Sequence, residues 1–176
     1  MSLEKAAQHL NLLDAQARFD ALLTCCHATN WAMAVNRAAP YANGDDLWDA
    51  AEVVWSNATE ADRLEAFAAH PKIGGDVEAL RRKFAATNQT KSADWSSKEQ
   101  AGVASASQEV LERLSALNLE YEAKFGFIFI VCATGKSADE MLSLLEARLP
   151  NTRAKELDNA AREQLKITRI RLEKLA

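Results

Sequence analysis

His70 is the first residue in the chain whose type and setting suit proton transfer. It opens the run HPKIGG, residues 70–75. Imidazole titrates near physiological pH, so it can both donate and accept a proton. Pro71 restricts the backbone, and Gly74 and Gly75 allow the chain to approach a ligand closely. The run indicates a candidate acid/base, although a histidine at the end of a helix is often structural.

Glu99 is the second candidate, because its place on a predicted helix turns a carboxylate towards the core. In a helix over 96–117, Ser96, Glu99, Gln100 and Val103 share one face, and that face continues as an apolar stripe. A carboxylate on such a face needs a partner or a ligand. The alternative is that Glu99 completes a capping box and serves only its own helix.

Arg171 is the third candidate and lies in the last predicted helix, 152–175. It falls inside the apolar arc, between Ile167 and Leu175, whereas Arg169 falls on the opposite side. A core-facing arginine implies a buried acid, from the protein or from a ligand. A structural ion pair is the alternative. Three inward-pointing ionisable groups together form a site hypothesis, which pattern alone does not prove.

Two other motifs do not support a site of their own. The run ATGKS, 133–137, resembles the end of a phosphate-binding loop, but Ile130 stands where that loop needs glycine. Cys25, Cys26 and His27 are adjacent, and no second ligand pair stands at the usual metal spacing. We therefore expect a turn, packed thiols and no metal site.

Composition favours one globular domain over residues 1–176. Of the 176 residues, 48% are hydrophobic and 26% charged, and the net charge of −4 argues against nucleic-acid or anionic-membrane binding. Three cysteines without framework spacing fit a reducing compartment. The start lacks a signal-peptide pattern, and the apolar run 127–133 is too short to span a membrane. We expect a cytoplasmic protein.

Helix-forming residues dominate, and strand-like alternation is nearly absent. The sequence predicts an all-α, single-domain bundle of about eight helices. A buried irregular or extended segment is expected near 127–133, where a lone strand would have no partner. Proline and capping residues predict these helix bounds: 3–12, 15–27, 29–38, 46–57, 60–69, 75–87, 96–117, 118–125, 138–148 and 152–175.

The chain resembles the family of 2-oxo-4-hydroxy-4-carboxy-5-ureidoimidazoline (OHCU) decarboxylases of uric acid degradation. The matching pieces span nearly the whole length and keep the family's order: HPKIGG (70–75), SSKEQAG (96–102), NLEYEAKFGFIFIVCATGKS (118–137), RLPNTRAKEL (148–157) and KITRIRL (166–172). The resemblance implies an all-α fold, a small-molecule ureide substrate and no metal or organic cofactor. It also implies a homodimer.

Carried over by position, the resemblance implies that His70, Glu99 and Arg171 are catalytic. It implies substrate contacts at Pro71, Ser96, Glu99, Gln100, Phe129, Ile130, Val131, Cys132 and Ala133. The chain departs from the family at Ile128, where many members have proline, and at Lys72, a position that is frequently acidic. The stretch from His70 to Ser96 is also longer than in many relatives, which affects the expected pocket entrance.

The function that the resemblance implies is cofactor-independent decarboxylation of OHCU to (S)-allantoin. Two alternatives belong to other classes. One is a non-catalytic helical interaction module, in which the inward charges serve only structure. The other is a hydrolase acting on a related ureide, which would need an activated water and usually a metal or a nucleophile.

Overall fold

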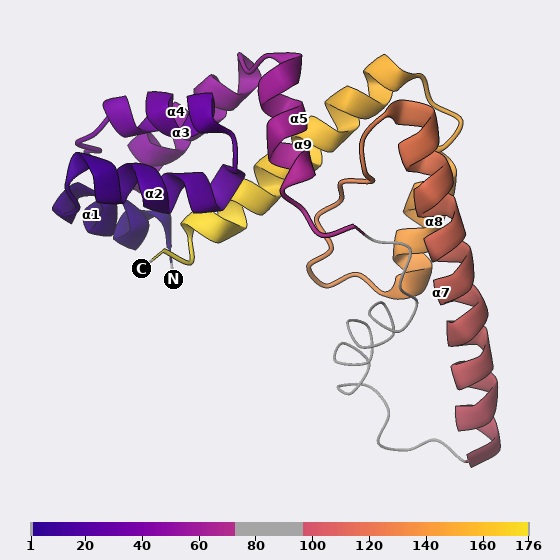
Figure 1. The fold of residues 1–176 in the computed structure, drawn as a ribbon. Helices are drawn as coiled ribbons and strands as arrows, with labels where there is room; N and C mark the ends of the chain where they lie inside the picture. The colour runs from indigo at the N-terminus through magenta and orange to yellow at the C-terminus, as the bar shows by residue number, and fades with distance from the viewer. Residues whose placement is uncertain (1, 73–96, 176) are drawn as a thin grey trace. The chain divides into compact units, whose positions relative to one another are not determined.

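The computed structural model describes residues 2–72 and 97–175, apart from the side chains of residues 97–107. This part of the chain contains eight helices and no strand, so the all-α prediction is confirmed (Figure 1). The helices are α1 (Leu3–Leu12), α2 (Ala15–Cys26), α3 (Thr29–Arg37), α4 (Gly44–Ser56), α5 (Glu60–Ala68), α7 (Ser97–Phe125), α8 (Ala138–Arg148) and α9 (Arg153–Leu172).

Side-chain caps set most of the helix starts that the sequence predicted. Asp14 accepts a hydrogen bond from the Ala17 amide at 2.8 Å and starts α2. Thr59 and Ser137 each form a reciprocal capping box, which satisfies amides that the first turn leaves unpaired. For α4 the predicted start was two residues late, because Asn43 caps the helix and the two aspartates lie in its first turn.

The predicted break between residues 117 and 118 is wrong, since α7 is one continuous helix of 29 residues. Asn118 stands at the expected break. Its side chain is buried, and its amide donates to the Leu114 carbonyl of the same helix at 2.8 Å. The polar group is therefore satisfied although the helix continues. The helix predicted over 75–87 lies outside the described residues, as does the capping role of Ser96.

The first compact unit consists of residues 1–70, 130–132 and 158–176. It contains α1 to α5 and most of α9. Trp31 is fully buried in it, and its indole N–H donates to the Ala51 carbonyl at 2.9 Å. Trp55 donates in the same way to Ala161 on α9, also at 2.9 Å. These bonds let large aromatic groups fill the core without an unpaired indole N–H.

The second compact unit consists of residues 71–129 and 133–157. In it α7 packs against α8, and the rings of Tyr121 and Phe125 are buried with centroids 4.5 Å apart. The guanidinium of Arg148 lies 4.7 Å from the centre of the Phe129 ring. Aromatic side chains each bury a large apolar area, so these rings contribute to the core of the second unit.

The segment between α7 and α8 is irregular and largely buried, as the sequence predicted. It begins at Gly126, whose φ of 79° is a left-handed conformation that suits glycine. Phe127 and residues 129–132 are buried, and Ala133 is half-buried. Helix α9 satisfies one backbone group of this segment, because a Glu163 carboxylate oxygen accepts from the Cys132 amide at 2.8 Å.

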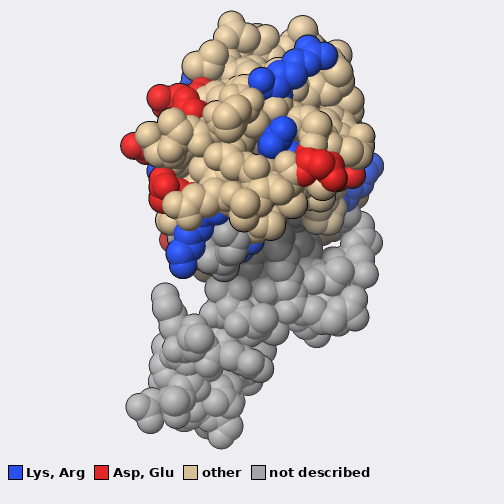
Figure 2. All heavy atoms as spheres, turned by 90° about the vertical axis from the view of Figure 1, so that its left-hand side faces the viewer, with Lys and Arg blue, Asp and Glu red and all other residues tan. Residues whose placement is uncertain are grey.

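The N-terminal helices present a surface of mixed charge. The face in Figure 2 carries Lys and Arg side chains interspersed with Asp and Glu, rather than a continuous field of one sign. The face shown therefore has no continuous positive patch that would attract a polyanion. Among the described residues, no helix combines the length and hydropathy needed to cross a membrane.

Candidate active site

His70 lies immediately after α5 and is held by helix α9. Its backbone amide donates to the Phe67 carbonyl at 3.1 Å, which continues the helical turn up to Pro71. The imidazole is half-buried, and its Nε2 lies 2.6 Å from Oε1 of Gln164. The structure therefore fixes the ring through a buried amide that the sequence analysis did not select.

Arg171 lies on α9 and is half-buried, whereas its predicted place was inside the apolar arc. Its Nη1 donates to the carbonyl oxygen of Cys25 at 3.1 Å. Within the described part of the chain, no carboxylate forms an ion pair with this guanidinium. A guanidinium has five N–H donors, so one bond to a carbonyl leaves donors for an anionic ligand.

One face of α9 carries Arg171 and Gln164, the residue that contacts His70. Gln164, Thr168 and Arg171 are spaced i, i+4 and i+7, so they lie in line along about 10 Å of helix. Gln164 also reaches the end of α2, where its Nε2 donates to the Cys26 carbonyl at 3.5 Å. Arg171 binds the preceding carbonyl, that of Cys25. The structure thus brings His70 and Arg171 to the same α2–α9 contact.

The electrostatics of this contact keep the neighbouring groups neutral. Burial raises the pKa of the Cys25 thiol to about 11 and that of Cys26 to about 12, so both are thiols at neutral pH. Burial, and secondarily the positive charge of Arg171, lowers the pKa of His27. Among the described residues, no group of three His, Cys, Asp or Glu side chains is placed to hold a metal.

The structure describes only some of the other predicted site residues. Glu99 and Gln100 lie in the first turn of α7, but their side chains are outside the described set, and Ser96 lies outside it altogether. Pro71 is exposed directly after His70. The predicted contact segment is mostly buried: Phe129, Ile130, Val131 and Cys132, with Ala133 half-buried. The Cys132 amide is already bound by Glu163.

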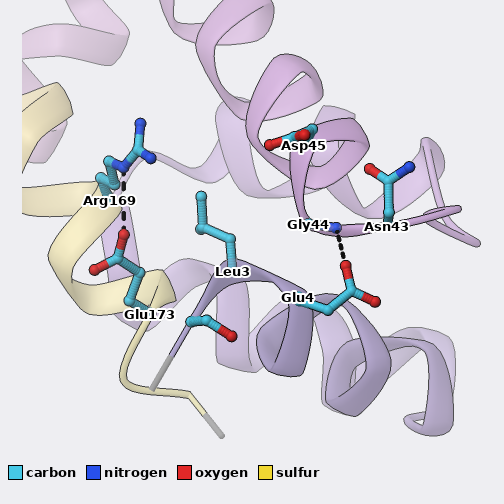
Figure 3. A pocket seen from close by; sticks show the side chains of 8 residues that line it. Leu3, Glu4, Asn43, Gly44, Asp45, Arg169 and Glu173 are labelled. Atoms are coloured by element: carbon cyan, nitrogen blue, oxygen red, sulfur yellow. Dashed lines mark hydrogen bonds and ion pairs between the residues drawn. The ribbon is translucent and has the colours of Figure 1, made fainter.

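A pocket elsewhere on the first unit is lined by Arg169, the arginine predicted on the opposite side of α9. This pocket has a volume of about 420 Å³ and is lined by residues of α1, α4 and α9 (Figure 3). Arg169 lines it, but its guanidinium pairs with Glu173 at 3.3 Å and lies over the Trp48 ring at 4.8 Å. The positive charge in this pocket is therefore already compensated.

The run RLPNTRAKEL has a structural role in the second unit. The Glu156 carboxylate is fully buried and accepts from Arg148 at 2.7 Å, Asn151 at 2.7 Å and the Tyr121 hydroxyl at 2.5 Å. Burial, and then the bond to Glu156, raises the pKa of Tyr121. This network joins α7, α8 and α9 within the second unit.

Comparison with known proteins gives consistent matches along the chain. The family model for OHCU decarboxylase matches residues 11–173. A uric acid degradation bifunctional protein from Arabidopsis thaliana is 34% identical over 86% of this chain and 45% of its own length. An OHCU decarboxylase from Halalkalicoccus jeotgali is 28% identical over 96% of this chain and 90% of its own. The chain spans about half the length of the first curated relatives, including one from Xenopus laevis.

Solved structures agree with the sequence matches. A crystal structure of an OHCU decarboxylase in the presence of (S)-allantoin is 34% identical, with a TM-score of 0.67. The match covers 89% of this chain and 96% of that one. An (S)-allantoin synthase, at 19% identity and a TM-score of 0.66 over 94% of this chain and 52% of that one, shares the fold. Because the family model matches nearly the whole length of this chain, the chain belongs to the OHCU decarboxylase family.

Proposed function

We propose that the chain decarboxylates OHCU to (S)-allantoin without a metal or organic cofactor. The observation that carries the proposal is the placement of an imidazole and a guanidinium on one α2–α9 contact, in a chain of this family. The relative crystallised in the presence of (S)-allantoin, which is the proposed product, supports the same substrate class.

The reaction requires a sink for one electron pair. When CO2 leaves, the pair passes into the neighbouring unsaturated part of the ring and gives an enediolate-like intermediate. A ring nitrogen takes up one proton with that electron pair, a second proton must reach the ring carbon on one face, and the hydroxyl gives up its own. The protein has to stabilise the oxyanion and direct the proton, which are tasks for a cation and an acid/base.

Each proposed residue has a part in these tasks. Arg171 binds an anionic or carbonyl oxygen of the substrate through the N–H groups that point away from Cys25. His70 exchanges the proton at the hydroxyl or its neighbouring oxygen. Glu99 and Gln100 hold ring or ureido N–H groups, and Ser96 and Pro71 also contact the substrate. Backbone groups of residues 129–133 bind the polar edges of the ureide. Cys132 contributes its carbonyl, because its amide donates to Glu163.

Freshly generated OHCU provides the test of this function. With purified chain, circular dichroism should show optically active allantoin forming faster than in buffer. No acceleration would mean that the assignment is wrong. Glu99→Ala should lose most turnover while remaining folded, and a wild-type rate would remove Glu99 from the catalytic set.

The same preparation separates the two alternatives. A non-catalytic interaction module predicts no thermal shift with allantoin, whereas a ureide pocket predicts a rise in melting temperature. A metal-dependent hydrolase predicts stoichiometric metal in elemental analysis and loss of activity with chelator. We expect a thermal shift, and activity that does not change when chelator is added.

We further propose that residues 1–176 act as one domain, that the protein is a homodimer and that it is cytoplasmic. The homodimer rests on the family resemblance. The cytoplasmic location rests on three cysteines without the spacing of a disulfide framework. Light scattering should give twice the chain mass of 19.3 kDa. A mass of one chain across the working concentration range would contradict the dimer.

A further inference from the structure

Gln164 is a fully buried polar residue on the face of α9 that carries the candidate site. Its exposed fraction is 0%, among apolar neighbours such as Ala160 and Ala161. A buried amide without partners would destabilise the fold. Both ends of this amide are bonded: Oε1 to His70, and Nε2 to the Cys26 carbonyl and, at 3.3 Å, to Thr168 Oγ1.

The partners determine which way the amide faces. The Cys26 carbonyl oxygen can only accept a hydrogen bond, so the NH2 group of Gln164 must face it. The amide oxygen then faces His70 at 2.6 Å, and an amide oxygen also only accepts. The donor must therefore be His70 Nε2, which carries a hydrogen in the neutral ring as well as in the charged one.

A neutral imidazole has one N–H, so this bond defines its tautomer. With the hydrogen on Nε2, the lone pair of the neutral ring is on Nδ1, and a proton that the ring takes up binds there. We propose that Gln164 is a positioning residue that holds His70 as the Nε2–H tautomer, so that proton exchange with the substrate takes place at Nδ1. The proposal rests on the proposed function, because it assigns His70 a substrate proton.

The end of α2 supports both halves of the candidate site in this arrangement. Consecutive carbonyls of Cys25 and Cys26 accept from Arg171 and from Gln164. Carbonyl groups at a helix C-terminus carry partial negative charge and are strong acceptors for such donors. Gln164 thus connects the His70 imidazole to the end of α2, and the same end of α2 binds the Arg171 guanidinium.

Nitrogen-15 NMR of histidine-labelled protein tests the tautomer directly and needs no substrate. Spectra that correlate the ring nitrogens with the carbon-bound hydrogens distinguish a protonated nitrogen from a bare one, and His70→Asn assigns the signal. At a pH where the ring is neutral, we expect Nε2 of His70 to be protonated and Nδ1 to be bare. A neutral His70 with its hydrogen on Nδ1 would overturn the proposal.

Kinetics of Gln164→Leu test the consequence for turnover. Leucine keeps most of the volume but removes the acceptor. We expect kcat to fall about 10- to 100-fold with KM within about two-fold, since orientation of the acid/base is lost while binding remains. The matched control is Gln16→Leu, which removes an exposed amide on α2 whose Nε2 donates to Asp20 nearby, and it should retain wild-type kinetics.

The outcomes separate this proposal from the proposed function. A folded Gln164→Leu protein with wild-type kcat would refute the positioning role while the decarboxylase assignment stands. A wild-type chain that does not accelerate OHCU decay would refute the function, while the NMR result still decides the tautomer. If the leucine variant does not fold, the spectrum of the wild-type protein decides alone.

Discussion

At the scale of single residues, two nearby arginines of α9 differ in their surroundings. Arg169 and Arg171 carry the same charge on the same helix, yet Arg169 is paired with Glu173 and lies over Trp48. Arg171 is half-buried and bonded to a backbone carbonyl. The difference is one of environment, since the helical repeat turns the two side chains about 160° apart.

Arg171→Ala should reduce kcat/KM for OHCU by about 100-fold or more, because a donor aimed at developing charge is lost. Arg169→Ala, which removes the same charge from the same helix, is the matched control and should stay within about two-fold of wild type. Steady-state assays of both variants give the comparison. Equal losses in the two would show that net charge, and not the position of Arg171, matters.

His27 provides a second test at this scale, in stability rather than activity. It ends α2 in a left-handed conformation with φ of 61°, which glycine adopts without strain. His27→Gly should therefore raise the free energy of unfolding by about 1 kcal/mol at pH 8. Urea denaturation measures the change.

The pH dependence of this effect has a definite sign. The pKa of His27 is lowered in the folded state from an ordinary value of 6.5, first by burial and then by Arg171. Below about pH 6.5 the unfolded chain takes up a proton more readily than the folded one, so histidine increasingly destabilises the fold. The advantage of glycine should grow as the pH falls from 7 to 5; an advantage that shrinks would contradict the lowered pKa.

At the scale of elements, α1 and α4 approach so closely that only glycine fits at position 44. A Cβ there would lie 2.5 Å from the Glu4 amide nitrogen and 2.7 Å from the Leu3 carbonyl carbon, both of them backbone atoms. The Glu4 carboxylate also accepts from the Gly44 amide at 2.8 Å. This contact fixes the start of α4 against α1 (Figure 3).

Gly44→Ala should lower the free energy of unfolding by about 1–3 kcal/mol, because the backbone must move to admit a methyl group. Helix propensity alone predicts the opposite sign, since alanine is favoured over glycine in helices. The control Asp49→Ala, exposed on the same helix, should change stability by less than about 0.5 kcal/mol. A stabilised Gly44→Ala protein would show that the two helices are not in such close contact.

The buried carboxylate of Glu156 makes the second prediction at this scale. Its removal would take a carboxylate away from the largely buried Arg148 guanidinium and an acceptor away from the Tyr121 hydroxyl. Glu156→Ala should therefore cost about 3–5 kcal/mol of unfolding free energy. The exposed pair Arg113–Glu146 is the control, and Glu146→Ala should cost less than about 1 kcal/mol. Similar costs would contradict the buried network.

Helix type and most helix bounds were predictable because they depend on local signals. Asp14, Thr59 and Ser137 cap helices as their types suggest, and prolines end them. The break expected near residue 117 did not occur, because Asn118 finds a partner inside its own helix. Whether an amide ends a helix or bonds back within it depends on burial, which a local pattern does not contain.

The candidate site was predictable only in part. Helical spacing placed Arg171 on the buried side, and the motif singled out His70. Gln164 was missed because a glutamine in a polar run, AREQLKI, gives no local sign of burial. The signal was available in spacing: residues 157, 160, 161, 164, 168 and 172 form one buried helical face, and Gln164 and Thr168 are its polar members. Glu99 stays a prediction.

At the scale of the whole molecule, the family model extends over both compact units, from residue 11 to residue 173. Helix α9 contributes to each, with its first turn in the second unit and the remainder in the first. Within the first unit it presents the site face, and within the second it supplies Glu156 to the buried network. The same helix therefore contributes to the candidate site of the first unit and to the buried network of the second.

The central claim is that His70 transfers a proton during the decarboxylation of OHCU. The most direct measurement follows the circular dichroism of allantoin formed from fresh OHCU by wild-type protein and by His70→Asn at equal concentration. We expect the wild type to produce one enantiomer rapidly and the folded variant to be slower by about 100- to 10,000-fold. A folded His70→Asn protein that forms optically active allantoin at the wild-type rate would contradict the claim.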